Sequence, residues 1–482
     1  MRKAMLFRYG RSDLIIDSDN LQVFTMLHKH FPKYATIKRT NVAAKILLAL
    51  LALACGSIKA QEDYVASREV MAARERFQDN KFGIFIHWGI YAMMADGEWN
   101  MQVNDRNHTE YEHLAAAFYP SRFSAAEWVS AIKASGAKYL TVTSRHHDGF
   151  SMFHSDASDY NIVDATPFKR DVIAELAAEC HRQGIDLHLY YSHLDWGRED
   201  YWPLGRTGHG TGRTSHGEWG TYARFMEQQL TELLTNYGKI GCIWFDGVWD
   251  KDEFPRERQP ELWGLYSQYE LIHRLQPGCL VGNNHHLLPF GGEDIQIFER
   301  DIPGQNEAGY SGQGISRLPL ETCQTMNGSW GYRMSDLEYK STEELIRYLV
   351  RTAGMNANLL LNVGPRPDGT LPEQAVERLR GIGEWLAANG KSIYGTRGGI
   401  IAPQDWGVTT QKDNVLYVHI LNLQDSTLTL ACGQHKLRKA TFLATGDKVA
   451  FKQAKDGGVT LTFAAPPQGT DCIVALEFKD DL

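Results

Sequence analysis

The eight residues Ile-Gly-Cys-Ile-Trp-Phe-Asp-Gly, at positions 240–247, set the architecture of this chain. They have the apolar, β-branched character of a short buried strand, which ends abruptly in an aromatic pair, an acid and a glycine. Side chains alternate along a strand, so Trp244 and Asp246 point to one side and Phe245 to the other. A carboxylate at the end of a buried strand is partly desolvated, which proteins accept mainly where the charge is paired or used in chemistry. The alternative is that Asp246 caps a turn after a core strand.

A unit of helix, glycine, apolar strand and polar tip recurs along the chain. Besides the strand ending at Asp246, strands are predicted at residues 81–89, 139–143, 185–191, 279–282 and 358–364. In a (β/α) barrel the tips of all strands meet at one face, so separate segments can build one site there. The sequence therefore predicts an α/β fold with a (β/α)8-like barrel. A doubly wound open sheet is less consistent with it, because no glycine-rich phosphate loop follows the first strand.

Two further regions complete the domain organisation. Residues 287–320 lack periodicity, and a region of this length inside a compact domain is usually a functional loop. From about residue 398, short alternating runs separated by polar turns predict a small C-terminal antiparallel β-sandwich domain. We therefore expect an N-terminal extension with a signal peptide at residues 1–60, a catalytic barrel at 61–397 and the β-sandwich at 398–482.

The composition is that of a globular protein without a nucleic-acid partner. The chain is 43% hydrophobic and 22% charged. Residues 1–60 hold ten of its Lys and Arg residues and three of its Asp and Glu residues, which leaves 40 basic against 55 acidic residues, a formal charge of −15, for the remainder. A surface with this balance repels a phosphate backbone.

The N-terminal region has the order of a secretory signal. Basic residues up to Lys45 precede a short apolar run and then small residues before Gln61. The run is too short to span a membrane. We expect cleavage after Ala60 and export to the periplasm or the extracellular space, with residues 1–37 reflecting an over-extended start of translation. Cys55 is an alternative acceptor for a lipid anchor.

The other cysteines are scattered and form no CxxC pair, so neither a zinc knuckle nor a dense disulfide framework is predicted. Histidines at strand tips nevertheless make a metal-dependent hydrolase one alternative function; they are His87, His146, His147, His193, His285 and His286. Against this alternative, no His-x-His pair ends the first strand. The sequence predicts no cofactor.

Six motifs together resemble a known family. They are Phe-Gly-Ile-Phe-Ile-His-Trp-Gly (82–89), Arg-His-His-Asp-Gly-Phe (145–150), Tyr-Tyr-Ser (190–192), Trp-Phe-Asp-Gly (244–247), Ser-Trp-Gly-Tyr (329–332) and Leu-Leu-Asn-Val-Gly-Pro (360–365). They occur in the order found in α-L-fucosidases of glycoside hydrolase family 29, and the resemblance covers roughly residues 65–480. One such motif would be weak, but six in register are specific.

The resemblance implies a retaining exo-hydrolase that removes terminal α-L-fucose from a fucosylated oligosaccharide or glycoprotein glycan, with Asp246 as the nucleophile. A second carboxyl would protonate the leaving oxygen and later activate water. The same likeness implies that a set of polar and aromatic side chains holds the sugar: His87, Glu98, Trp99, His146, His147, Tyr191, Trp244 and Trp330. Many relatives carry an Asn-Asp-Arg run where this chain has Asn283-Asn284-His285. We expect His285 to take the place of that arginine.

The second carboxyl is expected between residues 287 and 321. We favour Glu299, because it lies in the long loop between apolar residues that can raise its pKa. Glu321 is the main alternative acid/base, and Glu293 and Glu307 are further candidates. A non-catalytic fucose-binding barrel is a second alternative function, although retention of Asp246 argues against it. The sequence leaves the linkage, the aglycone and the oligomeric state open.

Overall fold

The computed structural model describes residues 4–9, 12–17, 22–26, 64–214, 217–251, 255 and 258–482. The chain divides into two compact units, Met1–Glu62 and Asp63–Leu482. In the first unit, three strands form an antiparallel sheet: β1 (Ala4–Tyr9), β2 (Ser12–Asp17) and β3 (Gln22–Met26). The expected signal segment at residues 38–60, with Cys55, lies outside the described residues.

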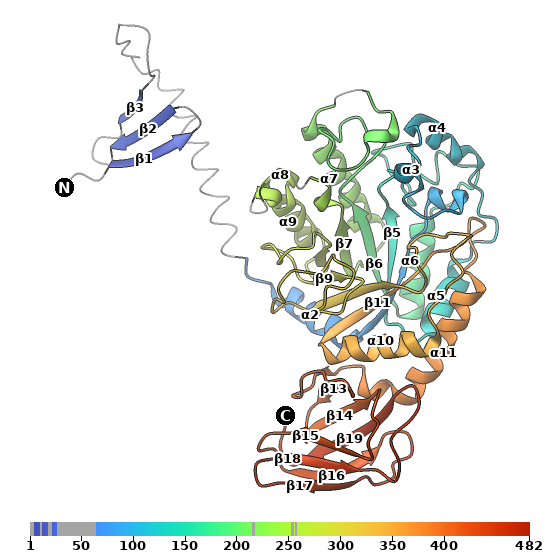
Figure 1. Cartoon of the computed structure of the whole chain (residues 1–482). Coiled ribbons are helices and arrows are strands. Elements are labelled where there is room, and N and C mark those ends of the chain that lie inside the picture. The colour runs from blue at the N-terminus through green and yellow to red at the C-terminus, as the bar shows by residue number, and fades with distance from the viewer. Residues whose placement is uncertain are drawn as a thin grey trace. The chain divides into compact units, whose positions relative to one another are not determined.

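Eight parallel strands form a barrel in the second unit and follow one another around it in chain order (Figure 1). They are β4 (Phe82–Ile86), β5 (Tyr139–Arg145), β6 (Asp186–Ser192), β7 (Cys242–Asp246), β8 (Leu280–Asn283), β9 (Gln296–Glu299), β10 (Leu320–Thr325) and β11 (Ala357–Val363). A parallel bridge between Gly282 and Ile295 brings the β8 side of the sheet to the β9 side. The predicted (β/α)8-like barrel is confirmed.

Strand alternation divides the apolar side chains of the barrel into two groups. On β7, Phe245 packs in the large core that includes the surrounding helices, whereas Trp244 belongs to a smaller cluster inside the barrel. Helix α2 (Arg68–Asn80) contributes Phe77 to this interior cluster. The interior is therefore packed, and the polar tips of the strands lie at the C-terminal end of the barrel.

Helices cover the outside of the strands, in the order α5 (Ala125–Ala134), α6 (Val172–Gln183), α7 (Trp219–Asn236), α9 (Leu265–Leu275), α10 (Thr342–Gly354) and α11 (Glu373–Asn389). Their ends follow local sequence signals. The Asp171 side chain caps α6 by accepting a hydrogen bond from the Ala174 N–H at 2.8 Å. Gly184 ends the same helix with a φ of +73°, a conformation that favours glycine.

The region predicted to be irregular contains one of the barrel strands and ends where the next one begins. Strand β9 lies within residues 287–320, and β10 begins at Leu320. Periodicity missed β9 because it is only four residues long, and it missed β10 because that strand buries polar side chains such as Thr322 and Thr325. The described segments after β8 and β9, residues 284–295 and 300–319, are loops where a regular barrel would have helices.

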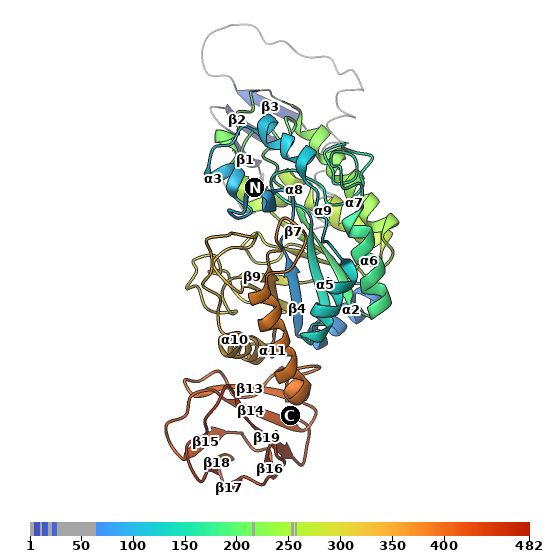
Figure 2. The same cartoon turned by 90° about the vertical axis from the view of Figure 1, so that its right-hand side faces the viewer.

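The C-terminal region forms two antiparallel sheets, as predicted (Figures 1 and 2). One contains β12 (Arg397–Gly398), β13 (Gly407–Lys412), β14 (Val415–Ile420), β19 (Cys472–Phe478) and β16 (Leu437–Phe442), and the other β15 (Thr427–Ala431), β18 (Gly458–Thr462) and β17 (Ala450–Gln453). Leu416, Leu430 and Val459 are among the side chains that fill their common core. Helix α10 packs against β12 and β13 and so joins the sandwich to the barrel.

Candidate active site

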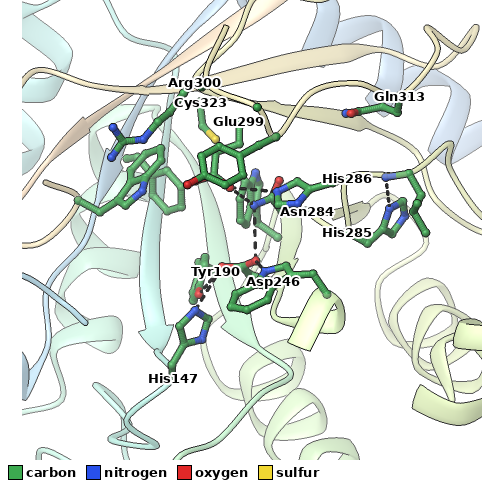
Figure 3. A pocket seen from close by; sticks show the side chains of 18 of the residues that line it. His147, Tyr190, Asp246, Asn284, His285, His286, Glu299, Arg300, Gln313 and Cys323 are labelled. Carbon is green, nitrogen blue, oxygen red and sulfur yellow. Dashed lines mark hydrogen bonds and ion pairs between the residues drawn. The ribbon is translucent and has the colours of Figure 1, made fainter. Parts of the chain in front are cut away.

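A cavity of about 1040 Å³ opens at the C-terminal ends of the barrel strands (Figure 3). Its wall combines strand tips with the loops after β8 and β9. The structure brings most of the predicted site residues together there: Asp246, Glu299, His87, Glu98, Trp99, His146, His147, Trp244, His285 and Trp330. Tyr191 and Glu321 do not line the cavity.

Asp246 ends β7 with its carboxylate surrounded by hydrogen-bond donors. Oδ1 accepts from the Gly247 N–H and from the Trp249 indole N–H, both at 2.8 Å, and Oδ2 accepts from the Tyr190 hydroxyl at 3.0 Å. Burial raises the pKa of Asp246 to about 6, with a further contribution from the charge of Glu299, while Trp249 and Tyr190 oppose the rise. The acid is therefore ionised at neutral pH.

Glu299 ends β9 and faces the same cavity (Figure 3). Its Oε2 accepts a hydrogen bond from Asn284 Nδ2 at 2.8 Å and lies 3.1 Å from His286 Nε2. Burial by itself would raise the pKa of Glu299, but the hydrogen bond and charge of His286, followed by Asn284 and Arg300, bring it below its ordinary value. These neighbours thus favour the charged form of this carboxyl.

The Asn284 amide spans the two acids. Its Nδ2 lies 3.5 Å from Asp246 Oδ1 and 2.8 Å from Glu299 Oε2, so these two oxygens are at most 6.3 Å apart. Two carboxyls at this separation can act together on one bond of a small molecule placed between them.

Three histidines line the wall beside Asp246. His87 Nδ1 is held by Asn362 Oδ1 at 2.7 Å, and His147 Nδ1 by Ser192 Oγ at 2.7 Å. Burial lowers the pKa of His87 to about 3 and those of His146 and His147 well below the usual value. The rings are therefore neutral, and each can donate and accept a hydrogen bond. His146 Nδ1 is buried without a hydrogen-bond partner, so it is available to a ligand.

Glu98 and two tryptophans complete the wall. Glu98 is buried and accepts a hydrogen bond from the Gly331 N–H at 2.7 Å, and burial raises its pKa. The Trp330 ring lies against His87, with centroids 5.2 Å apart, and Trp99 stacks on Trp249 at 5.8 Å. Flat apolar faces next to buried hydrogen-bonding groups suit a small ligand that carries both hydroxyls and C–H surfaces.

Comparisons with known proteins point to one family. The family model described as Alpha-L-fucosidase matches residues 51–391. The chain belongs to the α-L-fucosidase family. The plasma alpha-L-fucosidase of Homo sapiens is 30% identical to it over 377 residues, which cover 72% of this chain and 75% of that protein.

Solved structures of fucosidases share the fold. Alpha-L-fucosidase isoenzyme 1 from Paenibacillus thiaminolyticus matches with a TM-score of 0.75 and 31% identity, covering 86% of this chain and 100% of that chain. An alpha-L-fucosidase GH29 from Bacteroides thetaiotaomicron, solved as a trapped covalent intermediate with 2-fluoro-fucosyl fluoride, matches with a TM-score of 0.74 and 25% identity over 86% of this chain and 99% of that chain. The family resemblance drawn from the six motifs is confirmed, and the protein is a glycosidase of the fucosidase type.

The tyrosine that lines the cavity is Tyr190, one position before the predicted Tyr191. On the sheet Tyr190 pairs with Trp244 and Tyr191 with Phe245, so alternation turns Tyr190 into the barrel and Tyr191 away from it. Tyr191 instead donates a hydrogen bond to Gln229 Oε1 on α7 at 2.9 Å. The sequence does not distinguish two adjacent tyrosines in one motif, whereas the pairing of β6 with β7 shows which one points into the barrel.

The alternative acid, Glu321, lies inside the barrel behind the cavity wall. Oε1 accepts from the Trp244 indole N–H at 2.8 Å and Oε2 from the Tyr139 hydroxyl at 2.6 Å. Burial raises the pKa of Glu321 to about 7. Both oxygens are occupied by protein donors, so this carboxyl orients Trp244 while Glu299 faces the cavity.

The other candidate acids are also placed elsewhere. Glu293 is buried against Tyr269 and His285, and Glu307 is exposed in the loop after β9. His285 lines the cavity, but its Nε2 contacts Glu293 at 3.0 Å; its neighbour His286 is the histidine that contacts Glu299. His286 reaches the acid through a left-handed backbone conformation, φ +61°, that the sequence does not signal.

Three contributors to the site escaped sequence reasoning: Tyr190, Trp249 and Asn284. Trp249 follows Asp246 closely in the chain, and this spacing after a predicted strand tip was the available signal. Asn284 belongs to the run that departs from the family pattern. Its hydrogen bonds to both acids depend on how β8 lies beside β7, which only the fold specifies.

Within the part of the chain that the structure describes, no three His, Cys, Asp or Glu side chains form a group that could hold a metal ion. None of the described helices combines the length and the apolar character that crossing a membrane requires. The cysteines in the described residues are free thiols: Cys180, Cys242, Cys279, Cys323, Cys432 and Cys472.

Matched tyrosine variants test the assignment on β6. Tyr190→Phe removes a hydrogen bond to a charged carboxylate, and such bonds contribute about 1.5–3 kcal/mol, so we expect kcat/KM on a fucoside to fall roughly ten- to hundred-fold. Because Tyr190 lowers the pKa of Asp246, the acidic limb of the pH profile should also move to higher pH. Tyr191→Phe is the control, which should lower the Tm and leave kcat/KM almost unchanged. The reverse result would restore Tyr191 to the site.

Glu321→Gln tests the buried carboxyl through the pH dependence of stability. The pKa is about 7 in the folded protein and near 4.5 in the unfolded chain, so the folded state binds more protons between these values and stability falls as pH rises through that window. The loss amounts to about 3 kcal/mol at most. Gln keeps an acceptor for Trp244 and a donor for Tyr139. We expect the variant to have a flatter profile of Tm against pH and a higher Tm than wild type above pH 7; identical profiles would contradict this.

Proposed function

We propose that the enzyme is a retaining exo-hydrolase that releases terminal α-L-fucose from fucosylated glycans through a covalent fucosyl-enzyme intermediate. The observation that carries this proposal is the separation of at most 6.3 Å between Asp246 Oδ1 and Glu299 Oε2. Retaining glycosidases have carboxyls about 5–5.5 Å apart, whereas inverting enzymes need about 6.5–9.5 Å to admit a water molecule. The trapped covalent intermediate of the Bacteroides thetaiotaomicron relative supports the same class of mechanism.

Asp246 is the proposed nucleophile. Its carboxylate attacks the anomeric carbon, and the bond from that carbon to the leaving oxygen breaks. Tyr190, Trp249 and the Gly247 N–H hold the carboxylate in a fixed orientation, so it needs little reorganisation before attack. Since its pKa is about 6, the nucleophile is charged at and above neutral pH.

Glu299 is the proposed acid and base. In the first step it gives a proton to the leaving oxygen, and in the second it takes one from water. The first step requires a protonated Glu299, although His286, Asn284 and Arg300 lower the pKa of this carboxyl, so the step draws on the fraction of enzyme in which Glu299 carries the proton. Ester formation then removes the charge of Asp246, which lowers the pKa of Glu299 and suits it to the base role. His286 contacts Glu299 Oε2 at 3.1 Å and so helps to hold this carboxyl in place.

The neutral histidines and Glu98 are proposed to bind the hydroxyls of fucose, with the aromatic wall against its methyl group and C–H face. Because His87, His146 and His147 stay neutral, they can both donate to and accept from hydroxyls. Such hydrogen bonds orient the ring and can strengthen in the transition state. A fucose-binding protein without activity would not need the paired acids that face this pocket.

Variants of the two acids test the mechanism. Asp246→Ala should fail on natural and on activated aryl fucosides alike, and azide should rescue it with formation of β-fucosyl azide. Glu299→Ala removes leaving-group protonation, which is worth about 10²- to 10⁴-fold, so it should lose far more rate on a fucosylated sugar than on a dinitrophenyl fucoside. Glu321→Ala is the control and should show no dependence on the leaving group. If Glu321→Ala showed the dependence on the leaving group and Glu299→Ala did not, Glu321 would be the acid.

We expect activity without added metal, because Asp246 and Glu299 themselves supply the nucleophile and the proton. Hydrolysis of an aryl fucoside should therefore continue unchanged after dialysis against a strong chelator. Loss of activity on dialysis, followed by its return with zinc, would favour the metal-dependent alternative.

We also propose that the protein is exported and that the mature chain begins near Gln61. The support is the order of basic, apolar and small residues at positions 38–60. N-terminal sequencing of the protein from cell fractions should find residue 61 in the exported pool, whereas a lipid anchor would leave a modified N-terminus at Cys55. An intact N-terminus in the cytosolic fraction would refute export.

A further inference from the structure

The cavity extends well beyond the groups assigned to fucose. Ligand pockets span about 300–1000 Å³, and this cavity of about 1040 Å³ exceeds what one six-membered sugar ring requires. Its lining also includes Gln259 on α8 (Gln259–Trp263) and residues of the loop after β9, among them Tyr310 and Gln313. The proposed mechanism uses none of these three side chains.

Tyr310 presents an aromatic surface next to the proposed acid. Its side chain is 48% exposed, although it is a large ring. The ring lies against His286, with centroids 5.7 Å apart and planes inclined by 35°, and His286 in turn contacts Glu299 at 3.1 Å. Glu299 must lie within hydrogen-bond reach of the leaving oxygen to protonate it. The group bonded to that oxygen therefore emerges close to Tyr310.

Hydrogen bonds fix the loop that carries Tyr310. Asp301 Oδ1 accepts from the N–H groups of Glu307 and Ala308 at 3.0 and 3.1 Å, and the Ser311 N–H donates to Asn306 Oδ1 at 2.9 Å. Ser311 Oγ also donates to the backbone oxygen of Glu299 at 3.1 Å. The loop is thus tied to the strand that ends in the acid, and it holds the exposed ring in place before a ligand arrives.

Two amide oxygens of residues in the cavity wall have no hydrogen-bond partner. The Gln259 side chain is 4% exposed, and its Oε1 is buried without a donor; Gln313 Oε1 is likewise buried and unpaired. A buried acceptor without a donor is unfavourable. The hydroxyl groups of a sugar are donors that can satisfy these oxygens while its C–H face covers an aromatic ring.

We propose that Tyr310, Gln259 and Gln313 form a binding subsite for the sugar to which fucose is attached, with the Tyr310 ring as its stacking platform. This inference rests on the proposed function, because the position of the leaving group follows from the role of Glu299. It makes the natural substrate a fucosylated oligosaccharide whose second ring contributes to transition-state binding, in preference to a fucoside with a small leaving group.

The test compares two substrates that share fucose and differ in the leaving group. α-L-Fucosyl fluoride has no second ring, and its partner is whichever α1,2-, α1,3-, α1,4- or α1,6-linked fucosyl disaccharide the wild type hydrolyses fastest. Tyr310→Ala should lower kcat/KM on the disaccharide about tenfold, because one apolar ring face of the sugar loses its cover. The same variant should change kcat/KM on the fluoride less than about twofold. Tyr310→Phe keeps the ring and should resemble wild type on both. Gln259→Leu should also lower kcat/KM on the disaccharide and leave kcat/KM on the fluoride unchanged.

The outcomes separate this inference from the proposed function. If the wild type hydrolyses neither fucoside, the proposed function fails. If the wild type is active and Tyr310→Ala lowers kcat/KM equally on both substrates, Tyr310 acts through His286 on the acid and the subsite is refuted. The subsite is also refuted if Tyr310→Ala leaves kcat/KM unchanged on both substrates. A Tm close to that of wild type for Tyr310→Ala establishes that the comparison is made on folded protein.

Discussion

The site depends on holding the Asp246 carboxylate charged at the end of an apolar strand. Burial alone moves the pKa of this acid towards neutrality, and the hydrogen bonds from Tyr190 and Trp249 oppose that shift. Tyr190 comes from the neighbouring strand and Trp249 from the turn after Asp246, so the charge is stable only when β6 and β7 are in register. The proposed nucleophile and the barrel therefore depend on the same packing.

The second constraint is the approach of Glu299, which arises from an irregularity of the barrel. The described segments after β8 and β9 are loops, where a regular barrel would carry helices on its outer surface. These loops remain at the C-terminal end and contribute Asn284, His286 and Tyr310 to the cavity wall. The Asn284 amide then touches both acids and fixes their separation. These two described loops thus form one side of the cavity.

The polar groups of the cavity differ in burial and in charge. The three histidines beside Asp246 are deeply buried and neutral, which suits them to hydroxyl groups rather than to charge compensation. His286 is more accessible, lies at the cavity rim and contacts the acid directly. Glu321 keeps its raised pKa behind the wall, where it orients Trp244. Burial depth therefore separates the histidines proposed to bind a sugar from the histidine that contacts the proposed acid.

The sequence by itself determined the architecture and the nucleophile candidate. Apolar strands with polar tips predicted a parallel barrel. The carboxylate of Asp246 was recognisable because a charged group after a buried strand is unfavourable unless it is paired or takes part in chemistry. His87, His146 and His147 were found in the same way, since each directly follows a strand whose apolar run is long enough to recognise. Local patterns suffice for these residues because strand ends in a barrel meet at one face.

Only the tertiary structure decided which of several similar residues enters the cavity. Tyr190 and Tyr191 differ by one position on a strand, so the pairing of β6 with β7 determines which one points inward. The choice between Glu299 and Glu321 depends on β9 and β10, a four-residue strand and a strand with buried polar side chains, which carry no recognisable period. The positions of His286 and Asn284 depend on a left-handed residue and on the approach of β8 to β7. These are long-range relations of register and backbone path, and no local pattern of residues encodes them.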